Sequence, residues 1–201
     1  DHRADFAGHA GHPFAETPSL DRLAAEGVRF ERAYVTTSLC SPSRASFLTG
    51  TTPRSHGVWN NFTPWSDANR TFFEYLSQAG YATAFVGKWH MPGKLPVLRG
   101  VDHFVTFTNL GGQGIYEWCP LVVDGREEPS RTRYIATELT DRALAWMEQH
   151  RDRPFALLLS HKSVHADFVP DEPDRGRFAG APFALPDGAH PWTHLTNAQY
   201  T

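Results

Sequence analysis

The feature of this sequence that most constrains its fold is a strong helical pattern followed directly by an apolar run. Residues 133–150, "RYIATELTDRALAWMEQH", carry a stripe of apolar side chains at helical spacing, namely Ile135, Leu139, Ala143 and Trp146. Glu138 and Arg142 are four residues apart and can form an ion pair on the helix. The following run "RPFALLLSH", residues 153–161, is continuously apolar and predicts a strand. This pattern predicts a helix that packs onto a sheet.

The same order of elements is predicted twice more. Residues 17–27, "TPSLDRLAAEG", indicate a helix with Thr17 as N-cap and Gly27 as its end, followed by an extended segment, "VRFERAYVTT", over 28–37. Residues 71–80, "TFFEYLSQAG", indicate a helix closed by Gly80, followed by a buried strand, "YATAFVG", over 81–87. Helix followed by strand, three times over, predicts an α/β layer with a mostly parallel sheet.

The extent of the predicted domain follows from where these patterns start and stop. The sequence opens in a polar segment, and from Asp167 onward Pro, Gly, Asp and His replace the periodic patterns. An α/β domain is expected to begin with a strand and to close with further strands and helices. We therefore expect residues 1–201 to be the N-terminal part of a larger domain without its first strand. Residues 167–201 are expected to be a loop-rich segment of that domain.

Charge, hydropathy and cysteine content bear on three questions: a nucleic-acid partner, a membrane span and the redox compartment. The net charge is −3 and the basic residues are scattered, so there is no electrostatic reason to expect a nucleic-acid partner. No apolar stretch approaches the roughly 18 residues of a membrane-spanning helix, and no membrane span is expected. Cys40 and Cys119 could form at most one disulfide, so cysteine usage does not identify a redox compartment.

Chemically reactive side chains follow each of the three predicted strands. In open α/β sheets, ligands bind beyond the carboxyl ends of the strands. The residues at these three ends are Lys88, Trp89 and His90; His161, Lys162 and His165; and Cys40, Ser43 and Arg44. Cations and imidazoles that converge on one sheet edge would make a site for an anion. A cysteine at the start of the predicted helix "SRASFLTG" would also lie where the helix dipole favours negative charge.

Residues 40–50, "CSPSRASFLTG", resemble the sulfatase signature CxPSRxxxLTG, whose cysteine is oxidised after translation to formylglycine. Two more segments are similar to blocks of the same family: "GYATAFVGKWH" over 80–90 and "PFALLLSHKSVHADFVP" over 154–170. Cys40 on its own could be a buried structural thiol, a nucleophile used as it stands, or a precursor. The resemblance favours a precursor, with Pro42 and Arg44 in the recognition sequence of the converting enzyme. It also implies an alkaline-phosphatase-like α/β fold.

The resemblance implies a reaction, the hydrolysis of an organic sulfate ester. One hydroxyl of the hydrated aldehyde at position 40 would attack sulfur, and the second would expel sulfate. Arg44 would hold the hydrate, while Lys88 and His90 would contact the nucleophile and the sulfate oxygens. His165 would bind sulfate beside the leaving oxygen and act as general acid.

The resemblance also implies cofactors and partners. A hard divalent cation, usually calcium in this family, polarises the sulfate through oxygen ligands. Asp1 matches the second Asp of the family's N-terminal Asp-Asp pair, so Asp1 and residue 40 are the metal ligands expected within this sequence. The expected partners are a small-molecule or saccharide sulfate ester and, during maturation, the formylglycine-generating enzyme.

Several alternatives stay open at the level of sequence. A phosphonate or phosphate ester hydrolase on the same fold could share the signature, and a catalytically incompetent protein could bind sulfated ligands without cleaving them. His161 or Lys162 could face the site in place of His165, because Asp167 stands where the family usually has Pro. Cys119 is interpreted as structural, and His56 as a helix-capping or loop residue.

Overall fold

A computed structural model describes residues 2–3, 5–93, 95, 98–108 and 112–181 of the chain. These residues form two units, which we describe separately. The larger unit is Val35–His165 and contains the sheet. The smaller unit combines described residues before Val35 with those from Ala166 onward.

The larger unit is built on a five-stranded mixed sheet with the order β4-β3-β2-β1-β5. Strand β1 (Ala82–Gly87) pairs in parallel with β2 (His103–Phe107) on one side and β5 (Phe155–Ser160) on the other. Strand β3 (Leu121–Val123) pairs antiparallel with β2, and β4 (Arg126–Glu128) pairs antiparallel with β3. All six residues of β1 are buried, as its apolar sequence predicts for an inner strand. The predicted α/β fold with a mostly parallel sheet is confirmed.

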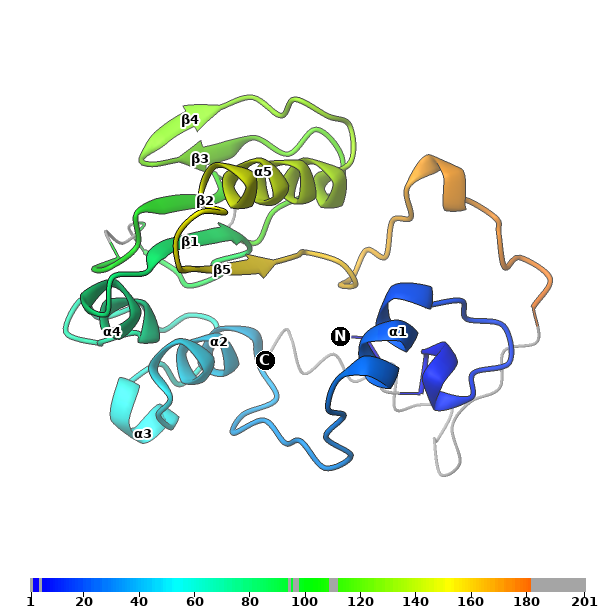
Figure 1. Cartoon of the computed structure of the whole chain (residues 1–201), viewed down its shortest axis with the longest axis horizontal. Helices are drawn as coiled ribbons and strands as arrows, with labels where there is room; N and C mark the ends of the chain where they lie inside the picture. Colours follow the sequence, from blue (N-terminus) through cyan, green and yellow to red (C-terminus); the bar gives the residue numbers. More distant parts are fainter. Residues whose placement is uncertain (1, 4, 94, 96–97, 109–111, 182–201) are drawn as a thin grey trace. The chain divides into compact units, whose positions relative to one another are not determined.

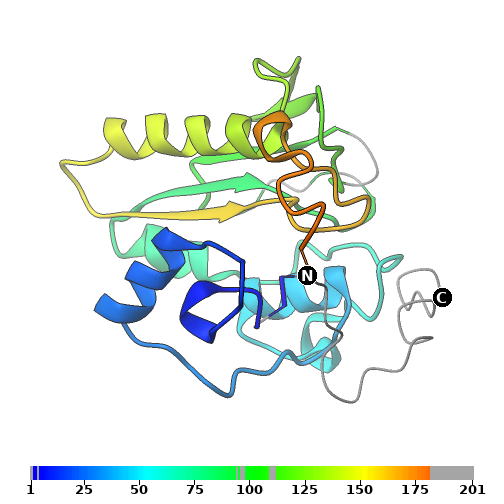
Figure 2. The same ribbon diagram turned by 90° about the vertical axis from the view of Figure 1, so that its right-hand side faces the viewer.

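Helices cover both faces of this sheet, as Figures 1 and 2 show. Helix α5 (Ile135–Gln149) lies on one face, with its predicted stripe Ile135, Leu139, Ala143 and Trp146 buried. Glu138 and Arg142 form the expected ion pair at 2.7 Å. The other face carries α4 (Phe72–Gln78), α2 (Cys40–Thr49) and the short α3 (Pro53–His56). The predicted helix over 71–80 is therefore confirmed, and Gly80 follows it with a positive φ.

Apolar packing fixes α2 against the sheet. Ala45 and Leu48 of α2 are fully or nearly fully buried in one cluster with Phe73 of α4, Phe85 of β1 and Trp89. Each buried apolar side chain of this size contributes roughly 1.5–3 kcal/mol relative to exposure. The helix that begins at the signature cysteine is thereby held beside the carboxyl end of β1.

The strand predicted over residues 28–37 is wrong. Residues 28–36 adopt no regular secondary structure, and Val28, Phe30 and Tyr34 are about four-fifths exposed or more. The apolar residues of this segment would need a neighbouring strand to cover them, and none of the five described strands pairs with it. An extended, apolar sequence alone does not make a strand, because the sheet hydrogen bonds must come from a partner.

The β3–β4 hairpin was not predicted, although its turn has a recognisable sequence. Asp124 and Gly125 both have positive φ, at 48° and 82°, which is the geometry that Asp-Gly favours in two-residue hairpins. The flanking strands are only three residues long, so the period-two pattern is too short to stand out.

The smaller unit contains α1 (Pro18–Glu26) and two 3-10 turns, η1 (Gly8–Ala10) and η2 (Glu172–Asp174). The helix predicted over 17–27 is confirmed, but the Thr17 side chain does not cap it. Its hydroxyl instead accepts from the Gly8 N–H at 2.9 Å and donates to Asp21 at 2.8 Å. No helix among the described residues is long and apolar enough to cross a membrane.

Candidate active site

The carboxyl ends of β1 and β5 are neighbours, and they bring Lys88 and Ser160 together. Gly87 is in register with Ser160, and the Lys88 N–H donates to the Ser160 carbonyl at 2.7 Å. Both strands run in the same direction in Figure 2, so the segments that follow them start at the same edge of the sheet. The prediction that these two strand ends meet is confirmed.

Arg44 locks helix α2 onto this edge. Its Nη1 donates to the Lys88 carbonyl at 2.7 Å and to the Ser160 hydroxyl at 2.6 Å. The Ser160 hydroxyl in turn donates to the Lys88 carbonyl at 3.2 Å. Burial lowers the pKa of Arg44, although a guanidinium stays charged at any physiological pH. One buried cation therefore joins α2, β1 and β5.

Cys40 is the first residue of α2 and a free, half-buried thiol. The next residue anchors it, because the Ser41 N–H donates to Asn61 Oδ1 at 2.9 Å and the Ser41 hydroxyl donates to the His90 carbonyl at 2.5 Å. Burial lowers the pKa of both Arg44 and Lys88, and a negative charge at position 40 would partly oppose that effect. The signature cysteine is thus in electrostatic reach of two cations.

Lys88 and His90 are strongly perturbed by their surroundings. Lys88 is 2% exposed, and burial, assisted by the charges of Arg44 and Lys162, lowers its pKa to about 8. Burial and the neighbouring Lys88 also lower the pKa of His90 to about 3, so its imidazole is neutral at physiological pH. His90 Nδ1 is buried and has no hydrogen-bond partner within the described chain. Perturbed titratable groups gathered beside an unsatisfied polar atom are typical of a ligand site.

His165 and Lys162 belong to the same cluster. Both are buried, and the positive charge of each contributes to the low pKa of His90. His165 Nε2 lies 3.4 Å from the amide nitrogen of Gln113. His161 is half-buried, with an Nδ1 that lacks a hydrogen-bond partner in the described part of the chain. Lys162 and His165 are therefore both within electrostatic range of His90.

The metal ligands expected from the sequence are not assembled by the described residues. Asp1 lies outside them. Over the parts of the chain that the structure describes, no group of three or more His, Cys, Asp or Glu side chains could hold a metal ion. A hard cation such as calcium needs six or more oxygen ligands. The residues in place around Cys40 are nitrogen donors and cations, which fit an anion instead.

Two residues interpreted as structural are accounted for by burial and by contacts within the fold. Cys119 is fully buried, and burial raises the pKa of its thiol. His56 is buried at the end of α3, where Nδ1 accepts from the Val58 N–H at 3.1 Å and Nε2 lies 3.0 Å from the Ser46 hydroxyl. Both imidazole nitrogens are used within the fold.

Sequence reasoning missed four polar residues that shape the site. They are Asn61, Gln113, Tyr116 and Ser160. Ser160 could have been found, because it is the last residue of a predicted strand and faces an edge rich in cations. The other three lie in irregular segments, where no periodicity indicates which side chain points inward.

Comparisons with known proteins give a consistent result. Residues 1–183 match the sulfatase family. The chain is 31% identical to an N-acetylglucosamine-6-O-sulfatase of Bacteroides thetaiotaomicron, with 92% of the chain and 33% of the relative covered. It is 33% identical to the human N-acetylgalactosamine-6-sulfatase, with 87% of the chain and 40% of the relative covered.

Solved structures agree with these relatives. BT4656, in complex with its substrate D-glucosamine-2-N,6-O-disulfate, matches with a TM-score of 0.86 at 31% identity, over 93% of this chain and 37% of that chain. Ps i-CgsB in complex with k-i-k-neocarrahexaose matches with a TM-score of 0.77 at 26% identity, over 88% and 46%. The chain thus spans between a third and half of the length of these proteins. The family match, the identities and the fold together show that the chain belongs to the sulfatase family.

Proposed function

We propose that this chain carries the nucleophile end of an enzyme that hydrolyses an organic sulfate ester, with formylglycine made from Cys40. The observation that carries the proposal is the cluster of cations and imidazoles around Cys40. Arg44 comes from α2, whereas Lys88 and His90 come from the segment that follows β1, and Arg44 also bonds to Ser160 at the end of β5. Such a cluster stabilises an oxyanion, as sulfate transfer requires.

Each residue is assigned a role that its surroundings support. Arg44 is rigid and always charged, so it would fix the side chain at position 40 and balance its charge. Lys88 would donate to sulfate oxygens while protonated, below its pKa of about 8. His90 is neutral and would hydrogen-bond the sulfate or the nucleophile. His165 would give its proton to the ester oxygen as the sulfur–oxygen bond breaks, so that the product leaves as an alcohol.

Formylglycine at position 40 fits the local structure. The Cys40 side chain is half-buried rather than enclosed, and it lies at a helix N-terminus beside two cations. A hydrated aldehyde supplies two hydroxyls, one to attack sulfur and one whose ionisation releases sulfate. Helix dipole, Arg44 and Lys88 all favour negative charge at this position.

We also propose a divalent cation, with calcium as the first choice, held in part by Asp1 and by an oxygen on residue 40. The described residues do not make this site by themselves, and the roles assigned above do not depend on the ion. When bound, the ion would polarise the sulfate oxygens.

The substrate is proposed to be a sulfated saccharide. The two sulfatases compared above are named for 6-sulfates of N-acetylated amino sugars. BT4656 is bound to a disulfated glucosamine. Relatives of similar identity are named arylsulfatases, so the proposal of a saccharide rests on the sugar complex of BT4656, which matches this chain with a TM-score of 0.86.

The test is hydrolysis of 4-nitrophenyl sulfate, 4-nitrophenyl phenylphosphonate and N-acetylglucosamine 6-sulfate by the full-length protein from its native host. Sulfate release is expected from both sulfates, and Cys40→Ala should lower it by about a thousandfold or more, as loss of a covalent nucleophile does. Cys119→Ala is the matched control and should retain activity. A clear preference for the phosphonate, or full activity of Cys40→Ala, would contradict the proposal.

A further inference from the structure

The segment between β2 and β3 reaches His165 through two side chains, Gln113 beside the imidazole and the buried Tyr116 at the backbone. The Tyr116 hydroxyl donates to the His165 carbonyl at 2.6 Å and accepts from the His165 N–H at 2.9 Å. Both backbone groups of one residue are thus bound to a single oxygen, across 49 positions of sequence. His165 follows β5 in a segment without regular secondary structure, so its backbone has no sheet or helix ladder to hold it.

The ring of Tyr116 contacts a second member of the cluster. Lys162 Nζ lies 5.0 Å from the ring centroid, within the range of a cation–π interaction. Lys162 is 5% exposed, and its charge lowers the pKa of both Lys88 and His90. The Tyr116 hydroxyl therefore holds the backbone of His165, the proposed general acid. The Tyr116 ring holds the ammonium of Lys162.

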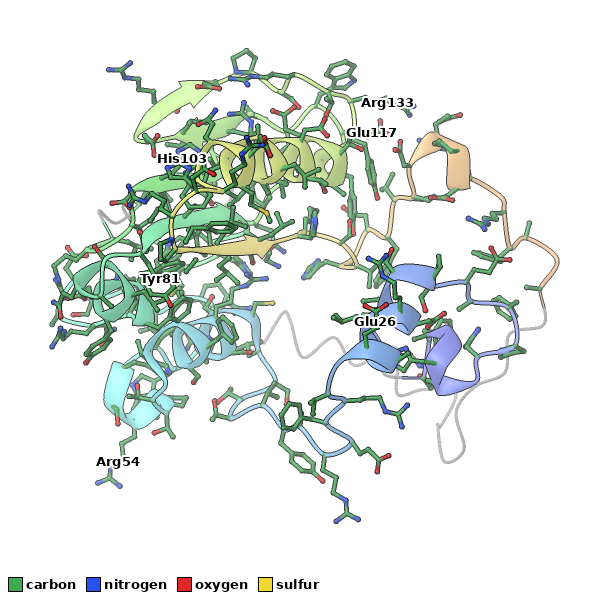
Figure 3. The ribbon with its side chains drawn as sticks, in the orientation of Figure 1. Glu26, Arg54, Tyr81, His103, Glu117 and Arg133 are labelled. Carbon is green, nitrogen blue, oxygen red and sulfur yellow. The ribbon has the colours of Figure 1, made fainter. Side chains whose placement is uncertain are left out.

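Tyr116 is itself held firmly, so it can act as a support. The Ile135 N–H, at the first residue of α5, donates to the Tyr116 carbonyl at 2.9 Å. The Tyr134 ring stacks on the Tyr116 ring with centroids 6.0 Å apart. Next to it, Glu117 and Arg133 form an ion pair at 2.8 Å, and both side chains are labelled at this connection in Figure 3. The support is thus anchored to α5, which packs on the sheet.

We infer that Tyr116 is a positioning residue of the proposed reaction, which places the His165 imidazole for proton transfer to the leaving oxygen and places Lys162 for binding the anion. The inference rests on the proposed function, because it assigns to Tyr116 the orientation of that function's general acid. General acid catalysis depends on the donor being within hydrogen-bond reach of the reacting oxygen. Loosening the His165 backbone would reduce proton transfer even though the imidazole is still present.

The hydroxyl and the ring can be separated by substitution. Tyr116→Phe keeps the ring under Lys162 and removes both hydrogen bonds to His165. Lys162→Met keeps the tyrosine and removes the cation. Tyr81→Phe is the matched control, because Tyr81 precedes β1 at the end of the strand opposite to Lys88 (Figure 3).

The experiment compares steady-state kinetics on a series of aryl sulfates whose phenols differ in acidity. A poor leaving group needs a proton in the transition state, whereas 4-nitrophenolate does not. His165→Ala should therefore lose about a hundredfold in kcat on phenyl sulfate and far less on 4-nitrophenyl sulfate. Tyr116→Phe should lower kcat by about tenfold on phenyl sulfate and by less on 4-nitrophenyl sulfate, with KM little changed. Lys162→Met should raise KM by a similar factor for every ester, and Tyr81→Phe should match the wild type.

A double variant completes the design. Adding Tyr116→Phe to His165→Ala should cause little further loss on phenyl sulfate, because the hydroxyl acts through the imidazole that is already gone. An equal loss by Tyr116→Phe on every ester, or full additivity with His165→Ala, would overturn the inference while leaving the proposed function intact. A His165→Ala variant without leaving-group dependence would overturn both. Should Tyr116→Phe fail to fold, an unchanged KM in Lys162→Met would still contradict the inference.

Discussion

Ser160 shows how one hydroxyl can hold a buried cation, Arg44, in place. It accepts from Arg44 and donates to the Lys88 carbonyl, so it completes a triangle of hydrogen bonds at the strand ends. Hydrogen bonds to a buried charged group contribute more than those between neutral groups. Arg44 keeps one partner, the Lys88 carbonyl, when Ser160 is truncated.

We predict that Ser160→Ala lowers the free energy of unfolding by about 1–2 kcal/mol and kcat by about tenfold. Urea denaturation and initial rates on an aryl sulfate measure the two effects. The control is Ser77→Ala, because Ser77 lies on α4, is half-buried and is remote in sequence from these strand ends. It should change the free energy of unfolding by less than about 0.5 kcal/mol and leave kcat near the wild-type value. Wild-type stability and activity in Ser160→Ala would show that Arg44 does not depend on this contact.

The buried ammonium of Lys88 lowers the stability of the fold, although the proposed function needs its positive charge. Its pKa falls from 10.5 in an exposed lysine to about 8, because burial disfavours the charged form. Between about pH 8 and 10.5 the unfolded chain therefore binds a proton that the folded chain does not, and stability contributed by this site rises with pH across that window. Below about pH 8 the folded protein bears the full penalty of a buried ammonium.

At pH 7 the free energy of unfolding of Lys88→Met is expected to be about 2 kcal/mol higher than that of the wild type. The variant should also lack the rise in stability that the wild type shows between about pH 8 and 10.5. Its sulfatase activity should fall at least a hundredfold, because the donor to the sulfate oxygens is gone. Thermal melts across this pH range, without added divalent cation, check the first claim. A variant less stable than the wild type at pH 7 would indicate that the ammonium is stabilised in the fold.

At the scale of elements, the site depends on the close approach of β1 and β5. Gly87 ends β1 with φ at 122°, and a Cβ at this position would overlap the Ser160 carbonyl. Only glycine lets Lys88 N–H reach that carbonyl at 2.7 Å. The spacing of these two strand ends thus determines where Arg44 finds its acceptors.

Gly87→Ala is predicted to destabilise the fold by about 3 kcal/mol and to abolish most activity, because β1 must move away from β5. Gly125→Ala in the β3–β4 turn is a matched comparison, since Gly125 also has a positive φ but open space around its Cα. It should cost only about 1 kcal/mol, from backbone strain alone. Denaturation midpoints of the two variants measure the difference. Equal effects would mean that the contact with Ser160 is not limiting.

The sequence predicts some elements of the molecule better than others for physical reasons. Helix α5 and strands β1 and β5 have uninterrupted patterns that identify them, and β1 is fully buried, whereas every residue of the edge strand β5 is only half-buried. Residues 28–37 have a strand-like sequence but no partner among the described strands. Strands β2 to β4 are too short for periodicity to identify.

The sequence likewise predicts some residues of the candidate site and not others. Cys40, Arg44, Lys88 and His90 lie where strand ends and a helix start are expected, and the fold brings them together. Ser160 could be located as the last residue of a predicted strand, whereas Tyr116 contacts His165 across 49 positions of sequence, which no local pattern reveals. Residues 166–181 contact the N-terminal segment instead of extending the larger unit, for example through Phe14 and Phe178.

The whole account depends on the chemical state of residue 40, and mass spectrometry of the tryptic peptide "AYVTTSLCSPSR", residues 33–44, measures it directly. The protein should be purified in full length from its native host and alkylated, beside a control sulfatase. We predict a peptide in which an aldehyde replaces the thiomethyl group of Cys40. An unmodified, alkylated cysteine under conditions that convert the control would remove the proposed nucleophile and contradict the assignment of this site to sulfate ester hydrolysis.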